Sequence, residues 1–304
     1  MAISRHQLVK ELEPGLNALF GLEYKRYDNQ HAEIYTSESS DRAFEEEVML
    51  SGFGNASVKS EGSGVAFDNA QESYSARYTH ETVALAFAIT EEAIEDNLYD
   101  RISSRYTKAL ARSMSNTKQV KAAAPLNNGL PSVDGFDSGD GVSLFNTAHT
   151  TVSGTNVKNT LSTQADLNET SLEQAMIDIS GMTDERGLRI AAKAVKMIVP
   201  SANQFQAERL MKSQGRTGTA DNDINSLASM GMIPQGYRVN NFLTDTDSFY
   251  IITDVPNGMK MFTRAPLTTA MEGDFDTGNV RYKARERYSF GVSDYRGIFG
   301  VEGA

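Results

Sequence analysis

A single uninterrupted helical pattern from Thr90 to about Lys121 is the feature that most constrains the fold. Thr90 is a residue type that commonly caps helices, and Glu91 and Glu92 follow in the first turn, where the helix dipole favours negative charge. No proline or glycine interrupts the pattern before Pro125, where we expect the helix to end. Roughly 30 residues make a helix about 45 Å long, well above the mean length. This length predicts an elongated spine.

The surface of this predicted spine needs more than one partner. Its charges are segregated, with like charges four residues apart: acids such as Asp96 come first, then bases such as Arg105. Such stacking destabilises an isolated helix by about 0.2–0.5 kcal/mol per pair. We therefore expect opposite charges, from an adjacent subunit or elsewhere, beside Asp96 and Arg105; a solvated charged face is the alternative. The apolar row also drifts around the helix, since it recurs every four residues against a 3.6-residue turn.

Alternating apolar residues between positions 51 and 89 predict a second long element, a β-hairpin. The period of two is the repeat of a strand whose side chains point alternately to opposite faces. A two-stranded hairpin is marginal alone in water, so we expect it to lie across another molecule. The alternating residues are Val58, Val65, Phe67, Tyr74, Ala76, Tyr78, Val83, Leu85, Phe87 and Ile89.

The negative charge of the chain lies almost entirely in its first third. Residues 1–100 hold 19 acidic and 7 basic residues, a net charge of −12, whereas the whole chain has −11. After one or two short helices broken at Pro14, we expect residues 30–47 to form an extended acidic arm that ends in Glu45, Glu46 and Glu47. An acidic segment suits docking onto a basic surface of a neighbour; a solvated acidic tail is the alternative.

The remaining chain predicts a long loop followed by α/β structure. Residues 127–168 are rich in glycine and small polar residues and predict a loop of the length usually found at functional sites or interfaces. The spacing of Thr170 and Glu173 predicts a helix start, with the helix ending near Gly187. Further expected elements are a buried strand at 194–199, a helix at 201–211, strands near 236–241, 249–253 and 260–262, and a closing ribbon at 280–299.

Four bases lie on one face of that ribbon at the strand period, and aromatic residues alternate with them. They are Arg281, Lys283, Arg285 and Arg287. A basic, aromatic strand is typical of a nucleic-acid platform. However, an acidic protein binds DNA poorly, and the same face suits the glutamate triplet of a neighbour's arm, so contact between subunits is the preferred interpretation.

Little in the sequence indicates catalysis, a cofactor or a metal. Cysteine is absent, which excludes thiolate chemistry and disulfides. Of four histidines, His149 is the most interesting, but without a catalytic companion we expect it to form hydrogen bonds within a loop. Residues 221–225 resemble a calcium loop, yet Ser226 and Met232 replace the glycine and glutamate such a loop needs. Neither a secretory signal nor an apolar run long enough to cross a membrane is apparent.

The order of these features resembles that of the major capsid protein of tailed bacteriophages, of the Hong Kong 97 type, and in particular its Mu-like major head branch. Four stretches carry the resemblance: residues 83–96, 140–149 with its Asp-Gly, Leu-Phe and His149, 196–200, and 290–297. It implies an α+β fold with an N-terminal arm (1–50), an E-loop hairpin (51–89), a peripheral domain (90–189 and 256–304) and an α/β axial domain (190–255).

The resemblance also implies function. A structural subunit without enzymatic activity would self-assemble as pentamers and hexamers into an icosahedral phage head, a virion shell assembled in the host cytoplasm around weakly held double-stranded DNA. A separate scaffolding protein, a portal and a decoration protein are the implied partners, and no cofactor, metal or membrane is expected. The candidate subunit contacts are Glu45, Glu46, Glu47, Lys59, Asp96, Arg105, Arg281, Lys283, Arg285 and Arg287.

Alternatives remain at this stage. An encapsulin-like compartment shell has the same fold, a hydrolase using His149 is a less favoured choice, and an adhesive or tail component would form tubes or fibres. Lys59 is the only lysine in the predicted hairpin. Some relatives cross-link such a lysine to a neighbouring subunit, but nothing in this sequence selects a partner for it, and we expect no covalent linkage.

Overall fold

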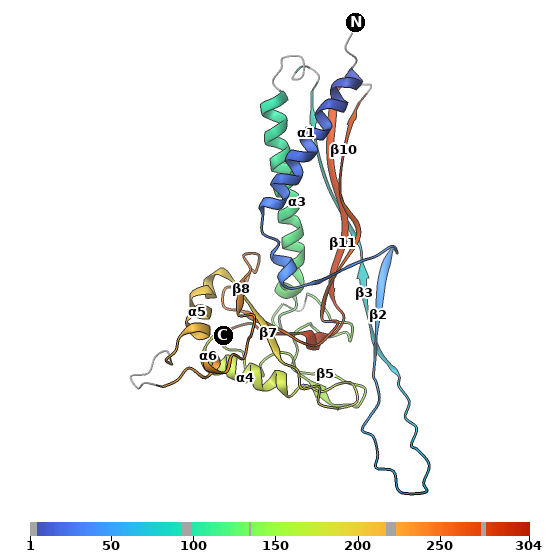
Figure 1. The fold of residues 1–304 in the computed structure, drawn as a ribbon, viewed down its shortest axis with the longest axis vertical. Helices are drawn as coiled ribbons and strands as arrows, with labels where there is room; N and C mark the ends of the chain where they lie inside the picture. Colours follow the sequence, from blue (N-terminus) through green and yellow to red (C-terminus); the bar gives the residue numbers. More distant parts are fainter. Residues whose placement is uncertain (1–4, 91, 93–98, 134, 217–222, 275–277) are drawn as a thin grey trace.

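The computed structural model describes residues 5–304 except 91, 93–98, 134, 217–222 and 275–277. Two long helices, α1 (Arg5–Arg26) and α3 (Tyr99–Asn128), lie beside a tall sheet, and a smaller α/β body and a projecting hairpin lie at the other end (Figure 1). Among the helices described, none is long and apolar enough to span a membrane. The molecule is therefore elongated, with large surfaces that its own chain does not cover.

Both long helices continue through a proline where the sequence predicted an end or a break. Helix α1 contains Pro14, and α3 contains Pro125 and continues to Asn128. Proline removes one backbone hydrogen bond, but packing around the last turn of α3 outweighs that loss. Leu126 is fully buried there, and its carbonyl accepts a hydrogen bond from the Tyr250 hydroxyl at 3.2 Å. The predicted start of the spine, including Asp96, lies outside the described residues.

The tall sheet has the order β1 (Thr36–Ser39), β10 (Met259–Gly273), β11 (Val280–Val292) and β4 (Glu81–Ile89). The two helices cover one of its faces. Residues of α1 and α3 pack there against side chains that alternate along β11; the buried cluster comprises Leu16, Phe20, Leu110, Ala111, Met114, Tyr282 and Ala284. The side chains that alternate with these along β11 point to the opposite face of the sheet.

The predicted hairpin pairing was wrong. Strand β4 pairs with β11, and the hairpin consists of β2 (Phe44–Leu50) and β3 (Glu72–Thr79) joined by a long tip. Accordingly, the glutamate triplet lies in a hairpin strand and not in an extended arm. The apolar alternation of β4 was read correctly as a strand, but it identifies no partner strand, and β11 offers a buried face that a free hairpin lacks.

The α/β body has a second sheet of β12 (Ile298–Val301), β9 (Phe249–Thr253), β7 (Ala194–Val199) and β8 (Tyr237–Val239). The predicted closing ribbon is thus divided between two sheets, with a 3-10 turn at Tyr295–Gly297 between them. This turn packs against another loop so closely that a Cβ atom on Gly297 would lie 2.3 Å from the Cα atom of Gly258.

Three helices flank this body: α4 (Glu169–Ser180), α5 (Gln204–Lys212) and the short α6 (Ser226–Met230), which was not predicted. Helix α4 ends earlier than expected. Its capping box uses Asn168 and Ser171 in place of the predicted Thr170 and Glu173, because Asn168 is the residue with extended backbone geometry. Residues 129–168 are mostly irregular, as predicted, with two short strands, β5 (His149–Thr150) and β6 (Asn156–Val157).

The segment between α1 and the tall sheet is fixed on α3 by a polar seam. The backbone N–H of His31 donates to Gln119 Oε1 at 3.0 Å, and Gln119 Nε2 donates to the Asp28 carbonyl at 3.3 Å. Burial and, to a smaller extent, the nearby charge of Lys118 lower the pKa of His31 to about 4, against an opposing effect of the hydrogen bond with Gln119. His31 is therefore neutral in the folded chain at neutral pH.

This seam predicts a pH dependence. In the unfolded chain His31 becomes protonated below about pH 6.5, whereas in the folded chain it stays neutral down to about pH 4. The free energy of unfolding therefore falls as the pH drops from 6.5 to about 4. Because His31 is partly exposed, we expect His31→Phe to reduce this pH-dependent loss of unfolding free energy by about 1–2 kcal/mol. Urea unfolding of unassembled subunits between pH 7.5 and 4.5 measures it. Parallel curves for the two proteins would contradict the assignment.

Candidate assembly surfaces

The tip of the hairpin, residues 51–71, exposes apolar side chains that its own chain does not cover. Val58 and Phe67 are 99% and 97% exposed. Lys59 lies between them in sequence and is also exposed. The other exposed apolar residues of the hairpin are Phe44, Val48, Leu50, Phe53 and Val65. Contiguous apolar exposure of this kind marks an interaction surface.

The base of the hairpin, in contrast, is tied to the tall sheet. Lys260 of β10 is buried, and its Nζ lies 2.5 Å from Glu47 Oε1 and 3.2 Å from Glu38 Oε1. Burial alone lowers the pKa of Lys260, but bonding to the two glutamates outweighs it and the net shift is upward. The Ser293 hydroxyl bonds to Glu47 of β2 and to the Tyr78 hydroxyl of β3, so this one hydroxyl, directly after β11, joins both strands of the hairpin to the tall sheet.

The other two glutamates of the triplet also have partners in their own chain. Glu45 accepts a hydrogen bond from Ser40 Oγ at 2.7 Å and lies 3.9 Å from Arg42, while Glu46 is paired with Arg77 at 3.7 Å. The structure thus does not bring the triplet and the basic row together. Contact between the triplet and a neighbour's bases stays a prediction, and Glu47 is the member least available for it.

A second buried network fixes the hairpin to the loop and the α/β body. Arg296 is 2% exposed; its Nη2 lies 2.6 Å from Glu185 Oε1, and its Nε donates to the Thr183 carbonyl at 2.8 Å. Glu185 Oε2 accepts from Ser73 of the hairpin at 3.0 Å and from the backbone of Val152 at 3.1 Å. One ion pair therefore positions four segments far apart in sequence.

The pKa values in this network follow from burial against charge. Burial raises the pKa of Asp294, and the adjacent Arg296, 3.2 Å away, only partly opposes it. For Arg296, burial acts downward, but the charge of Asp294 and bonding to Glu185 shift its pKa above the ordinary value. The guanidinium also lies over the Tyr295 ring, with its carbon 4.4 Å from the ring centroid. The sequence motif at 290–297 contains these residues, but it shows nothing of the distant Glu185.

The predicted basic row does lie on one face of β11. Arg281, Lys283 and Arg285 are exposed and Arg287 is half-buried, and all four point away from the two helices. Residues paired with them on the neighbouring strands are mostly small: Ala84, Ala86 and Ala88 of β4, and Ala265, Thr268 and Ala270 of β10. The basic side chains therefore project beyond the small residues beside them and are accessible to a partner.

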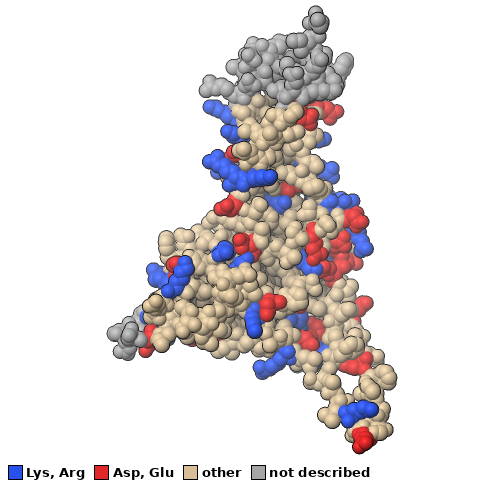
Figure 2. Space-filling model, in the orientation of Figure 1, with Lys and Arg blue, Asp and Glu red and all other residues tan. Residues whose placement is uncertain are grey.

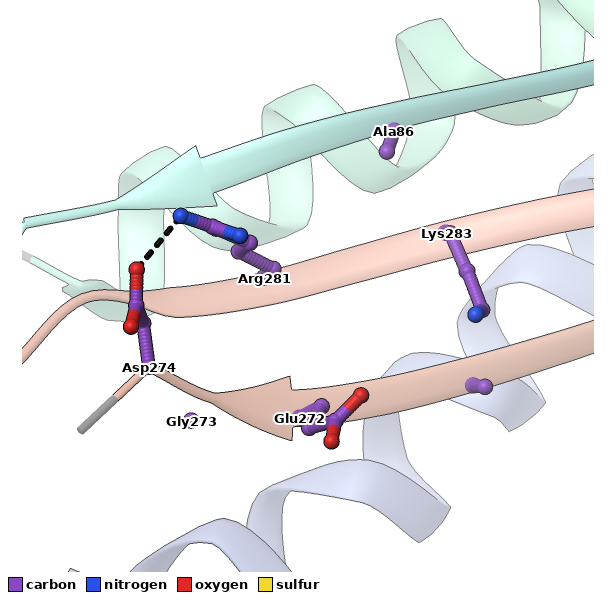
Figure 3. Close-up of a pocket in the computed structure, with 7 residues that line it drawn as sticks. Ala86, Glu272, Gly273, Asp274, Arg281 and Lys283 are labelled. Carbon is purple, nitrogen blue, oxygen red and sulfur yellow. Dashed lines mark hydrogen bonds and ion pairs between the residues drawn. The ribbon is translucent and has the colours of Figure 1, made fainter.

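A cavity of about 410 Å³ lies at the upper end of this face. Figure 3 shows Ala86 of β4, Lys283 and Arg281 of β11 and Glu272 of β10 around it, with Arg281 bonded to Asp274. Among the described residues, an ion pair of this row thus lies at this end, between Arg281 and Asp274. Figure 2 shows basic side chains along the upper half of the molecule and acidic ones grouped lower on the right-hand side.

Among the described residues of α3, ion pairs form near the C-terminal end of the helix. Lys118 lies 3.2 Å from the buried Glu286, and Lys121 is paired with Glu81 of β4. Arg105, Lys108 and Arg112 are exposed, and within the described ranges no acid forms an ion pair with them. The expected counter-charge at Arg105 is thus absent from the described part of its own chain, and a neighbour's acid remains the prediction.

His149 forms hydrogen bonds within the long loop, as predicted. Its ring is fully buried, with Nδ1 2.6 Å from Asp140 Oδ2 and Nε2 3.1 Å from Asn159 Oδ1, and it stacks on Tyr295 at 3.8 Å. Burial raises the pKa of Asp140, but bonding to His149 and Ser138 outweighs it and the net shift is downward. A sealed histidine with both nitrogens occupied has no access to a substrate. In the described residues, no group of three or more potential metal ligands occurs either.

Comparison with known proteins points in one direction. A family model described as phage capsid protein matches residues 73–301, and a search of curated protein sequences found no match. The chain is similar to the capsid of Myoviridae phage XM1, at 13% identity over 89% of each chain and a TM-score of 0.55. It also resembles the capsid of an empty GTA particle, at 15% identity over 90% of this chain and 89% of the other, with a TM-score of 0.54.

A virus-like particle from Pyrococcus furiosus has the same fold, at 10% identity over 95% of this chain and 98% of the other, with a TM-score of 0.54. At such low identities, these likenesses establish the fold alone, which is of the Hong Kong 97 type. The match to the family model establishes the family. The comparisons do not bear on the candidate subunit-contact residues, which stay predictions.

The Arg296 network predicts a selective loss of stability. Glu185→Gln removes one of the two carboxylates paired with the buried guanidinium, the other being Asp294, and we expect it to lower the free energy of unfolding by about 2–3 kcal/mol. The matched change Glu208→Gln breaks the exposed pair with Lys212 and is expected to cost less than about 1 kcal/mol. Denaturant unfolding of unassembled subunits measures both. Equal losses would show that burial of the pair is not the deciding factor.

Proposed function

This chain belongs to the phage capsid protein family and is a structural subunit of a virion shell, and we propose that copies assemble as pentamers and hexamers into an icosahedral head around double-stranded DNA. The observation that carries the proposal is the hairpin. Its base is bonded to its own chain through Lys260 and Glu185, while its tip exposes Val58 and Phe67 to solvent. A fixed base with an uncovered apolar tip is built to reach a neighbour.

Such contacts join different patches on two copies, so they are heterologous and close into rings only at particular rotations. In this proposal, residues 190–255 form the axial domain at the centre of each ring, and the spine helix and tall sheet form the peripheral domain. Arm and hairpin overlap adjoining copies, which distributes stability between chains. The net charge of −11 favours loose, non-specific contact with the packaged DNA.

Assembly in the host cytoplasm, with a separate scaffolding protein, a portal and a decoration protein, completes the proposal. A compartment shell with protein cargo is the second candidate, supported by the likeness of the fold to the virus-like particle from Pyrococcus furiosus. Nucleic acid within purified particles favours the phage head, and a protein cargo without nucleic acid favours the compartment.

Removing the apolar tip should block assembly without unfolding the subunit. Burying a Val or Phe side chain contributes about 1.5–3 kcal/mol, so Val58→Ser with Phe67→Ser is expected to raise the concentration needed for assembly by at least about tenfold. Val133→Ser, at an exposed position outside the hairpin, serves as the control. Sedimentation and negative-stain microscopy measure shells, and circular dichroism checks the fold. Normal closed shells from the double variant would contradict the proposal, as would tubes or fibres from the unaltered chain.

A further inference from the structure

Two arginines at the lower end of the basic face have buried hydrogen-bond donors without partners. The register passes from Thr263 opposite Tyr288 to Ala265 opposite Arg287, so Arg264 is an extra residue in a β-bulge beside Arg287. The Nε atoms of Arg264 and Arg287 are both buried, and neither has a hydrogen-bond partner in the part of the chain described. A buried donor left unmatched costs about 1–3 kcal/mol, more when the group is charged.

The surroundings of this pair are positive. His80 lies between β3 and β4, with Nδ1 3.0 Å from Ser289 Oγ and Nε2 3.0 Å from Ser40 Oγ. Its pKa is lowered by burial first and then by the charge of Arg287, with a smaller contribution from Arg264 and an opposing one from Glu45. Both guanidinium groups therefore act on the same small region.

The acid that acts on His80, Glu45, is already engaged. Glu45 accepts a hydrogen bond from Ser40 and is paired with Arg42. At the other end of the basic face, Arg281 has Asp274 as its partner, whereas the described residues provide no ion pair for Arg264 or Arg287. Within the described part of the subunit, this cationic site thus has no paired anion.

We propose that Arg264 and Arg287 bind a carboxylate side chain from residues 1–100 of a second copy of this chain. Charge complementarity supports this occupant, because residues 1–100 have a net charge of −12 and the other residues have a net charge of +1. A guanidinium fork binds a carboxylate through two parallel hydrogen bonds, and a carboxylate would supply the acceptors that the two unpartnered Nε donors lack. The site rests on the proposed shell function and identifies one contact within it.

Cross-linking tests the occupant directly. In Arg287→Lys shells built from a mixture of ¹⁴N and ¹⁵N copies, a carbodiimide should join Lys at position 287 to an aspartate or glutamate of residues 1–100. Mass spectrometry should find the two peptides carrying different labels, and dispersed subunits should lack the product. Cross-links only within one copy, or none in intact shells, would overturn the proposal.

Assembly measurements separate this contact from a structural role. Arg264→Gln and Arg287→Gln should each raise the concentration needed for assembly by at least about tenfold, while the unfolding midpoint of the unassembled subunit is unchanged or higher. Arg264→Lys, which keeps the charge but loses the fork, should fall between. Arg285→Gln, on the same face but without a buried donor, should have a smaller effect.

Three results would count against the carboxylate. Arginine variants that assemble as well as Arg285→Gln would overturn the site while leaving the shell function intact. Inorganic phosphate that binds dispersed subunits and is lost in Arg287→Gln would assign the site to a free ion. A labelled DNA duplex that binds unaltered subunits and is lost in the same variant would assign it to nucleic acid.

Discussion

The alternation of side chains along β11 is the constraint on which the rest of this structure depends. Every second residue faces α1 and α3, so Tyr282, Ala284 and Tyr288 are buried there. The intervening residues, including Lys283 and Arg287, point to the opposite side. Because a one-residue slip exchanges the two sets, the buried face fixes the register and the basic face follows from it. Core packing thus determines an assembly surface.

The two ends of the hairpin differ in a similar way: polar groups at its base are hydrogen-bonded, and apolar side chains at its tip are uncovered. Near its base, Glu47 and Ser73 are bonded to residues of the tall sheet and the body, and the charges there are compensated within one chain. Its tip has the opposite character, with Val58 and Phe67 in solvent. A hairpin whose base is bonded within its own chain and whose tip exposes apolar area gains most from association at the tip, since burial of that area is non-directional and tolerates small changes of angle between copies.

Expectations from sequence succeeded where one element carries its own pattern. The spine, the alternating strands β3 and β4, the buried strand at Ala194–Val199 and the basic row all appear, because periodicity reports which face of an element is buried. The alternation predicted at Val58, Val65 and Phe67 was wrong, since these residues lie in the irregular tip. They failed at pairings and ends. Nothing in β4 says that its partner is β11, and Pro125 gave a reasonable but wrong end for α3, since the hydroxyl that satisfies the Leu126 carbonyl comes from Tyr250.

The sequence by itself determined the family resemblance and the α+β class with its long spine helix, because these depend on the order and type of residues along the chain. Only the tertiary structure decided which charges are neutralised. Glu47 was expected to contact a neighbouring subunit but is bonded to Lys260 of its own chain. No sequence pattern indicated Arg264, which has a buried donor without a partner in the described chain. Ion pairing depends on distances of a few ångströms between residues more than 200 positions apart, which no local pattern encodes.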